Sequence, residues 1–483
     1  MSPGAATNAT DFGPTKKVSQ WIASVKLEDI PEDIRTRAKY LILDGLACGL
    51  MAAHLPTCEK AVNILAALEP AAGDAVLFGW AGKKVTPLTS ALLNGTFIQG
   101  FELDDWHSEA PLHSNSIILP ALLAAAQHLK MEKSVSGPEF LLATLVGFEV
   151  GPRVGRGLHG AHILSTGWHS GAVFGPSASA ASVSKLFGLS AESVEDALGI
   201  ACTQACGLMS AQFESEVKRM QHGFAARSGL MAAFLARGGY IGIKNVYERE
   251  YGGFLKQFSG GNGKSPQFLP EEVSKDLGIR WQTNSIRVKP YACVAAVHGA
   301  IDCVRFLQQR YPERFRANQI QDIKKIHIKS GPVNFHHGGW KAARPLTNTG
   351  AQMSATFAVA TQIIHNQVLA AQFRNDMLEN NDVWKLVDLS DCELAPEYPH
   401  GQHSMTIEFA DGSSVSQLVE NSRGVKPPLT NEEIVEKWRN LTKDIMDSEI
   451  VRKIEEIILS LDTLGDISPL YELLSTKTTN PIA

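Results

Sequence analysis

Helical segments rich in small residues recur through the first half of the chain and constrain its fold. Six segments combine apolar residues at helical spacing with many Ala, Ser and Gly residues: 31–53, 116–129, 137–150, 172–187, 193–209 and 224–235. The first begins with a proline and two acidic residues, as a helix N-terminus should. Small side chains allow helix backbones to approach closely. The pattern predicts a densely packed all-helical domain, which we place at residues 1–279.

A different pattern begins after residue 279. Residues 323–328 alternate in hydrophobicity like a short strand, and two strand-like runs, 405–410 and 413–419, flank an Asp-Gly pair that signals a hairpin. Helical periodicity also marks residues 293–308 and 353–367. These features predict an α+β domain at residues 280–424 with a small antiparallel sheet.

The C-terminal segment, residues 425–483, is helical in pattern again. Thr430, followed by Asn and two Glu, resembles a capped helix start, and residues 450–461 are amphipathic. We expect this segment to return to the first domain. The predicted fold class is therefore mainly α, with a large all-helical domain built from both chain ends and a smaller inserted α+β domain.

Composition excludes several classes of function. The 483 residues suffice for two domains, and 45 Lys and Arg against 50 Asp and Glu provide no overall basic face for nucleic acid. No window reaches the run of about 18 apolar residues that a membrane span needs. The first 14 residues lack the features of a signal or transit peptide, and the seven scattered cysteines suit a reducing compartment. We expect a soluble, cytoplasmic protein.

Glycine-rich motifs lack the context that nucleotide binding needs. Residues 155–160 have the G-x-G-x-x-G spacing of a pyrophosphate-binding turn, but the preceding residues are helical in pattern, whereas the turn must follow a strand. Residues 263–265 resemble the end of a phosphate-binding loop, but Phe258 stands where that loop requires glycine. The sequence therefore predicts no nucleotide cofactor.

Metal motifs are equally incomplete. His336 and His337 are adjacent, so their side chains point apart on a regular element, and no acidic or cysteine partner lies at ligand spacing. Cys202 and Cys206 are spaced for one helix face, but a pair alone lacks further ligands, and buried packing explains them better. We predict no bound metal.

Residues 102–114, ELDDWHSEAPLHS, concentrate four carboxylates and two histidines between two strongly apolar helices. A solvated, self-paired loop is the plain alternative to a catalytic site. His169 is a second unusual feature, because it stands among small residues just before an Ala- and Ser-rich helix. On its own it could be a packed core histidine.

Two basic clusters complete the set. Lys218, Arg219 and His222 directly precede an apolar helix, and helix N-termini with adjacent cations bind anions. Arg287 and Lys289 form a second cluster. Each cluster alone is more often a surface face. Carboxylates, histidines and cations together suit an anionic substrate that undergoes proton transfer.

The segments that carry these residues resemble the MmgE/PrpD family. They are ELDDWHSEAPLHS, GWHSG, LGIACTQACGLMSAQ, VKRMQHGFAAR, IRVKPYACV and ARPLTNTGAQMS, and the likeness spans nearly the whole chain. The resemblance implies a helical domain from both chain ends, an inserted α+β lid, a homodimer, an active site between domain and lid, and no metal or organic cofactor.

The resemblance also implies an activity on a small tricarboxylate. The block at 102–114 and the helix near residue 202 are most similar to members that decarboxylate cis-aconitate to itaconate and CO2. Lysines would bind carboxylates, and one histidine would protonate the carbanion. The residues carried over by motif are Asp104 or Asp105, His113, His169, Lys218 and Lys289 as catalytic candidates, with His107, Tyr291, Arg344 and Gln352 as secondary substrate-binding candidates.

Three alternatives stay open at this point. Dehydration of 2-methylcitrate within the same family would use a similar acid and base set. Trans-aconitate is a further candidate substrate. A catalytically inactive dimeric scaffold belongs to a different class, and it would tolerate loss of His169 and Lys218.

Overall fold

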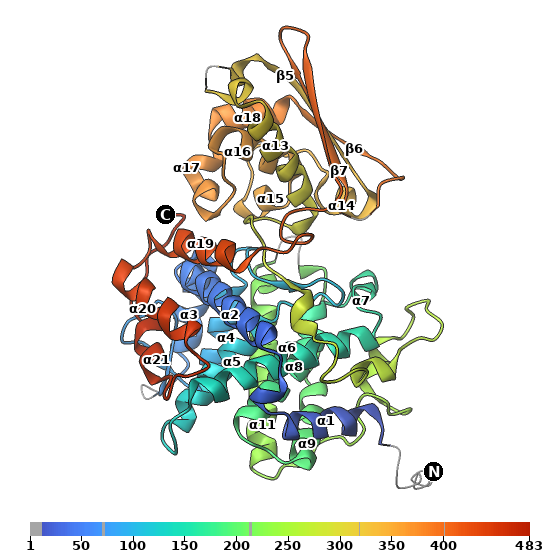
Figure 1. The fold of residues 1–483 in the computed structure, drawn as a ribbon, viewed down its shortest axis with the longest axis vertical. Coiled ribbons are helices and arrows are strands. Elements are labelled where there is room, and N and C mark those ends of the chain that lie inside the picture. The colour runs from blue at the N-terminus through green and yellow to red at the C-terminus, as the bar shows by residue number, and fades with distance from the viewer. Residues whose placement is uncertain (1–11, 70–72, 212–214, 318, 400) are drawn as a thin grey trace. The chain divides into compact units, whose positions relative to one another are not determined.

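A computed structural model describes residues 12–69, 73–211, 215–317, 319–399 and 401–483 (Figure 1). The chain divides into two compact units. Unit 1 comprises the described parts of Met1–Gly100, Asp104–Ile286 and Ile434–Thr479, and unit 2 comprises those of Phe101–Leu103, Arg287–Glu433 and Asn480–Ala483. The sequence placed the divisions at 279/280 and 424/425. The mainly helical prediction is confirmed.

Unit 1 is almost entirely helical. Its α-helices are α1 (Pro14–Ser24), α2 (Glu32–Ala52), α3 (Pro56–Ala66), α4 (Pro87–Ile98), α5 (Asn115–Leu129), α6 (Gly137–Gly157), α7 (His162–Ser165), α8 (Ser170–Leu186), α9 (Ala191–Cys202), α11 (Gln221–Arg237), α12 (Phe254–Phe258), α19 (Asn431–Thr442, in unit 1 from Ile434), α20 (Ser448–Leu459) and α21 (Ser468–Leu474). Short 3-10 helices are η1 (Leu27–Asp29), η2 (Glu216–Met220), η3 (Pro270–Val273) and η4 (Gln282–Ser285). Strands β1 (Ala75–Val76) and β2 (Lys84–Val85) pair antiparallel, and β3 covers Trp106–His107.

Helix α8 lies at the centre of unit 1, in contact with α5, α6, α9 and α11. All its residues except Lys185 are buried. The neighbouring backbones approach so closely that a Cβ added at Gly229 of α11 would lie 2.4 Å from Cβ of Ser179 and 2.6 Å from the carbonyl oxygen of Pro176. The small-residue content of these helices is thus a packing requirement.

A buried ion pair joins the C-terminal segment to the N-terminal part of unit 1. The Lys437 ammonium lies 2.6 Å from a carboxylate oxygen of Asp44, and the two side chains are 6% and 0% exposed. Burial raises the pKa of Asp44, and the charge of Lys437 offsets only part of that rise. A buried ion pair therefore links α19 to α2.

Unit 2 contains a four-stranded sheet of order β6-β5-β7-β8. Its elements are β4 (Ile286–Arg287, in unit 2 from Arg287), β5 (Ile323–Ser330), β6 (Ser390–Leu394), β7 (His403–Phe409), β8 (Ser414–Val419), α13 (His298–Arg310), α14 (Pro332–Gly338), α15 (Asn348–Gln352), α16 (Ala355–His365), α17 (Asn375–Leu378), α18 (Asn381–Asp388), and the 3-10 helices η5 (Ala295–Val297), η6 (Pro312–Phe315), η7 (Ile320–Asp322) and η8 (Ala370–Phe373). Helix α13 packs against β7 and β8 and also contacts α16.

The sheet departs from the sequence prediction in one respect. The hairpin β7–β8 and the pair β5–β7 are antiparallel as expected, but β5 and β6 are parallel, so the sheet is mixed. The chain reaches β6 from β5 through α14 to α18, and such a helical crossover allows parallel pairing. The prediction of a wholly antiparallel sheet was wrong because it omitted β6.

Most predicted helices are present, with two marked differences in length, of which one is that the helix predicted at 137–150 extends to Gly157 as α6. The segments predicted at 31–53, 116–129, 172–187 and 224–235 correspond to α2, α5, α8 and α11. The helix predicted at 193–209 ends at Cys202, so Cys202 is buried whereas Cys206 is exposed in the following loop. Gly155 and Gly157 of the G-x-G-x-x-G motif lie in the last turn of α6, and Gly160 follows it. The motif therefore follows a helix and not a strand, as the sequence predicted.

No single helix among the described residues has both the length and the apolar content of a membrane span. Helices α2 and α3 reach that content only as a pair bent by 82°.

Replacing Gly229 by Ala tests the close packing around α8. Helix propensity alone would favour Ala by about 1 kcal/mol, but the new methyl group would meet backbone atoms of α8. We expect net destabilisation of about 1–3 kcal/mol, measured by chemical denaturation. Gly465→Ala is the control, since a Cβ there meets nothing within 4 Å. Equal stability of the two variants would contradict the packing argument.

Candidate active site

The acidic loop before α5 contains two adjacent aspartates with different roles in the fold. Both oxygens of Asp105 accept backbone N–H groups at the start of α5, from Ser114 at 2.9 Å and from Asn115 at 3.1 Å. Burial and the neighbouring charge of Asp104 raise the pKa of Asp105 to about 7. The hydrogen bonds of Asp105 therefore hold the acidic loop against the start of α5.

Asp104 instead contacts a histidine. One of its carboxylate oxygens lies 2.9 Å from Nδ1 of His113. The Asp104 side chain is fully buried, and that of His113 is 20% exposed, so the imidazole is the member that a ligand can reach. A carboxylate at Nδ1 fixes the tautomer and leaves Nε2 as the atom that exchanges a proton.

His169 is the residue before the first turn of α8. Its Nδ1 accepts the backbone N–H of Ala172 at 3.4 Å, and the side chain is almost wholly buried. Burial, reinforced by the charge of His113, lowers the pKa of His169 to about 3. The imidazole is therefore neutral near pH 7, and acceptance at Nδ1 places its proton on Nε2.

His222 lies between these two histidines, and the sequence interpretation did not select it as a site residue. Its ring centroid is 4.8 Å from that of His113 and 5.1 Å from that of His169. Its position beside a basic cluster at a helix start was the only available signal. The arrangement thus contains three imidazoles and one carboxylate within unit 1.

Within the described part of the chain, three of these side chains also form a candidate metal site. Ligand atoms of Asp104, His113 and His222 lie within 4.8 Å of one another. Zinc accepts such a set at about 2.0–2.2 Å per ligand. A metal would have to draw the side chains closer together, and Asp104 and His113 already bind each other directly at 2.9 Å. The arrangement observed fits acid–base chemistry better.

Two cations of η2 lie in the same unit. Arg219 is buried, and one guanidinium N–H donates to the carbonyl of Gln99 at 3.4 Å. Burial lowers the pKa of Arg219 to about 10, with the charge of Asp104 opposing the change, so the guanidinium stays charged near pH 7. The predicted candidate Lys218 is half-buried. Arg219 is a cation that the sequence interpretation omitted from its site residues.

Lys289 belongs to unit 2, where its ammonium donates to a carboxylate oxygen of Glu102 at 3.0 Å. Both side chains are buried, at 4% and 7% exposure. Glu102 has a φ of +52°, a strained conformation for a residue with a side chain. The buried pair balances the charge of Lys289.

The secondary candidates in unit 2 all have structural partners. The Tyr291 hydroxyl donates to Asp302 at 2.5 Å. Burial, followed by the charge of Asp302, raises the pKa of Tyr291. The amide of Gln352 donates to the carbonyls of Phe101 and Ala292. Arg344 donates to Glu379 and Asn381 and lies over the Trp384 ring. Their roles in substrate binding stay predictions.

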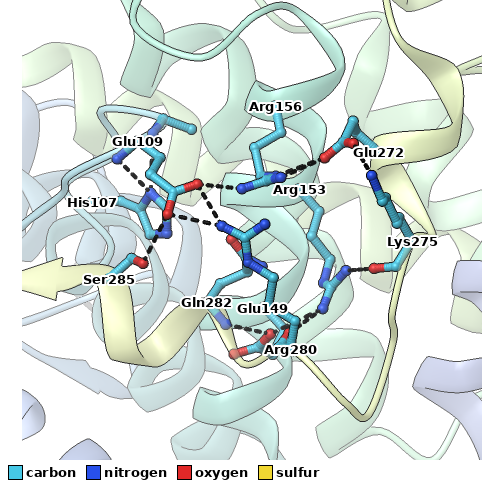
Figure 2. Close-up of polar contacts among 11 residues, drawn as sticks. His107, Glu109, Glu149, Arg153, Arg156, Glu272, Lys275, Arg280, Gln282 and Ser285 are labelled. Atoms are coloured by element: carbon cyan, nitrogen blue, oxygen red, sulfur yellow. Dashed lines mark hydrogen bonds and ion pairs between the residues drawn. The ribbon is translucent and has the colours of Figure 1, made fainter.

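His107, in unit 1, stabilises a turn of the acidic loop. Its Nδ1 accepts the backbone N–H groups of Glu109 at 3.3 Å and Ala110 at 3.0 Å. Figure 2 shows that the Glu109 carboxylate then points toward Arg156 and Arg280. Arg280 donates to it at 2.8 Å and 2.9 Å, and Arg156 also binds Glu272.

A buried pair beneath Glu109 holds the segment that supplies Arg280 (Figure 2). Glu149 accepts the backbone N–H groups of Gln282 at 2.8 Å and Thr283 at 3.0 Å. Arg153, one turn later on α6, donates to the carbonyls of Lys275 and Arg280. Helix α6 thereby anchors residues 272–285, and that segment in turn anchors the loop that carries His113.

Known proteins resemble this chain over nearly its whole length. Residues 16–267 match the MmgE/PrpD N-terminal domain, and residues 291–463 match the MmgE/PrpD C-terminal domain. Cis-aconitate decarboxylase of Aspergillus terreus is 44% identical over 491 residues, covering 100% of both chains. Cis-aconitate decarboxylase-like protein oryM of Aspergillus oryzae is 48% identical, covering 97% of this chain and 99% of that protein. Human cis-aconitate decarboxylase is 25% identical, with 95% and 94% covered.

The pKa of Asp105 predicts a pH-dependent stability. Between about pH 4, near the pKa of an unfolded aspartate, and pH 7, the folded state binds more protons than the unfolded state. Stability from this group therefore falls as pH rises, and the wild type should lose stability relative to Asp105→Asn over that range. Thermal unfolding midpoints at several pH values measure the difference.

Asp466→Asn serves as the control for this comparison. Burial opposes ionisation of Asp466, but hydrogen bonds from Ser134 and Ser468 lower its pKa overall, so it does not titrate over the same range. A constant difference between the wild type and Asp105→Asn would contradict the assignment.

Proposed function

Because the chain belongs to the MmgE/PrpD family, we propose that it is a carboxy-lyase that converts cis-aconitate to itaconate and CO2. The observation that carries this proposal is the pairing of Asp104 with His113 beside a neutral His169. The relatives named as cis-aconitate decarboxylases, matched over nearly the full chain, support the choice of substrate.

The reaction breaks one carbon–carbon bond and forms one carbon–hydrogen bond. The carboxylate on the CH2 group of cis-aconitate leaves as CO2, and its bonding electron pair forms a new double bond between the CH2 carbon and the central carbon. The electrons of the original double bond shift to the far carbon. The negative charge spreads onto the carboxylate at the far end of the allylic system. A proton then adds to the carbon next to that carboxylate and gives itaconate.

We assign the proton to His113. Asp104 accepts the Nδ1 proton of His113 and fixes the orientation of the ring, so Nε2 is the atom that delivers the proton. His169 is neutral and carries its proton on Nε2, which suits a hydrogen bond to the developing enolate. The two histidines thus take different parts, one as acid and one as neutral donor.

Unit 1 also supplies favourable electrostatics for a tricarboxylate. We propose that Lys218 and Arg219 bind substrate carboxylates, each worth roughly 3–4 kcal/mol of charge stabilisation where well placed. The first turns of α5, α8 and α11 meet at His222, and N-terminal helix turns favour anions. Lys289 in unit 2 remains a predicted carboxylate ligand. We propose that no metal or organic cofactor takes part.

The first test of function uses chelator-treated protein with cis-aconitate and, separately, with 2-methylcitrate, followed by NMR. We expect itaconate and CO2 from cis-aconitate. His113→Gln should lower kcat by about 100-fold or more, since it removes the proton donor. His128→Gln, a partly exposed histidine elsewhere in unit 1, is the control and should keep full activity. Formation of 2-methylaconitate without CO2 would instead assign a dehydratase.

The pH dependence of kcat distinguishes the two histidines. Because the pKa of His169 is about 3, this residue does not change charge between about pH 5 and pH 8. His169→Gln should therefore lower kcat and leave the shape of the pH profile unchanged. His113→Gln should alter that shape. Loss of a titration step in His169→Gln would assign the proton to His169 instead.

A further inference from the structure

His222, on α11, has neighbours on two helices that are distant in sequence, α5 and α8. It is the second residue of α11 and fully buried. Its Nδ1 lies 2.8 Å from the hydroxyl of Ser116 in the first turn of α5. A Cβ added at Gly171, in the first turn of α8, would lie 2.0 Å from its Nε2. The imidazole therefore fills the space where three helices begin.

The tautomer of His222 follows from the single proton of Ser116. The Ser116 hydroxyl donates to the carbonyl oxygen of His113 at 2.9 Å, and a carbonyl can only accept. The contact between Ser116 and His222 must then use a proton from the imidazole. His222 is thus protonated at Nδ1. The side-chain amide nitrogen of Gln99, 3.4 Å from Nε2, is a donor that suits a lone pair there.

The ring orientation links His222 to both proposed catalytic histidines. Its plane is tilted by 47° to His113 and by 54° to His169, with both rings in contact distance. A change in the His222 ring would leave room for either neighbour to rotate.

We propose that His222 is a positioning residue, which Ser116 holds in the Nδ1-protonated tautomer so that its ring fixes the relative orientation of His113 and His169. The inference rests on the proposed function and deepens it. A core histidine with only a packing role is the alternative. That alternative predicts effects on stability alone.

Two variants separate the ring from its hydrogen bond. His222→Phe keeps an aromatic ring but removes the bond to Ser116, and Ser116→Ala removes the acceptor but keeps the imidazole. We expect each to lower kcat by about tenfold to 100-fold with little change in KM, because misplaced reacting groups reduce turnover. The double variant should cost little more than either single variant, since both break the same contact.

Ser182→Ala is the matched control. This buried serine of α8 also donates to a carbonyl, that of Ala143 at 2.7 Å, but it lies outside the histidine group. It should keep the wild-type kcat. Unchanged kcat in both Ser116→Ala and His222→Phe would overturn the inference. Should His222→Phe fail to fold, Ser116→Ala alone decides the kinetic test.

NMR of isotope-labelled histidine nitrogens provides a test that does not need turnover. We expect the His222 signals to report protonation at Nδ1. These signals are assigned by their loss in His222→Phe or, if that variant does not fold, by their shift in Ser116→Ala. We also expect the His113 and His169 signals to shift in Ser116→Ala. Protonation at Nε2, or unshifted neighbours, would overturn the positioning role. A wild type inactive on cis-aconitate would overturn the proposed function alone, and these signals would then decide the inference.

Discussion

The close approach of α8 to α6 and α11 determines much of the arrangement in unit 1. Where a Cβ at Gly229 would lie 2.4 Å from Ser179, the helix axes have almost no freedom to shift. The same closeness recurs at the ends of the helices, where Gly95 of α4 and Gly223 of α11 meet. His222 lies beside Gly223 at the start of α11, and His169 immediately precedes α8. Their separation is therefore fixed by backbone contacts rather than by flexible side chains, and this rigidity is what acid–base chemistry needs.

Charge in the interior of unit 1 is balanced over several residues. Asp44, Asp104 and Asp105 are all fully buried. Burial is the main reason that the pKa of Asp105 is raised, and the charge of Asp104 is the second. Lys437 and Arg219 supply the compensating cations. Asp105 accepts hydrogen bonds from the α5 backbone, and Asp44 binds Lys437. Asp104 is therefore the buried acid of the three that pairs with His113, whose side chain is 20% exposed.

The sequence predicted those features that depend on local pattern. Helical periodicity located α2, α5, α8 and α11, and the Asp-Gly pair located the hairpin β7–β8. It failed where distant contacts decide. The apolar pattern continues past Cys202, although the chain leaves the helix there and Gly207 takes a φ of +127°. Only the coordinates show that Asp104 contacts His113 while Asp105 binds the α5 backbone, and that His222 has neighbours on α5 and α8.

The number of protons in the histidine group bears on which product forms. The carbanion left by loss of CO2 is allylic, so protonation at one end gives itaconate, whereas protonation at the CH2 end would give a methyl-substituted butenedioate. His222 lies 4.8 Å from His113 and 5.1 Å from His169 between ring centroids, and three imidazoles so arranged cannot all be charged without strong repulsion. Burial keeps His169 neutral, since its pKa is about 3, and Asp104 accepts the Nδ1 proton of His113, which we propose as the single donor through Nε2. A single proton donor at one fixed position would deliver its proton to one end of the allylic system. In the proposed mechanism, rigid packing and the limited number of charges would together select the product.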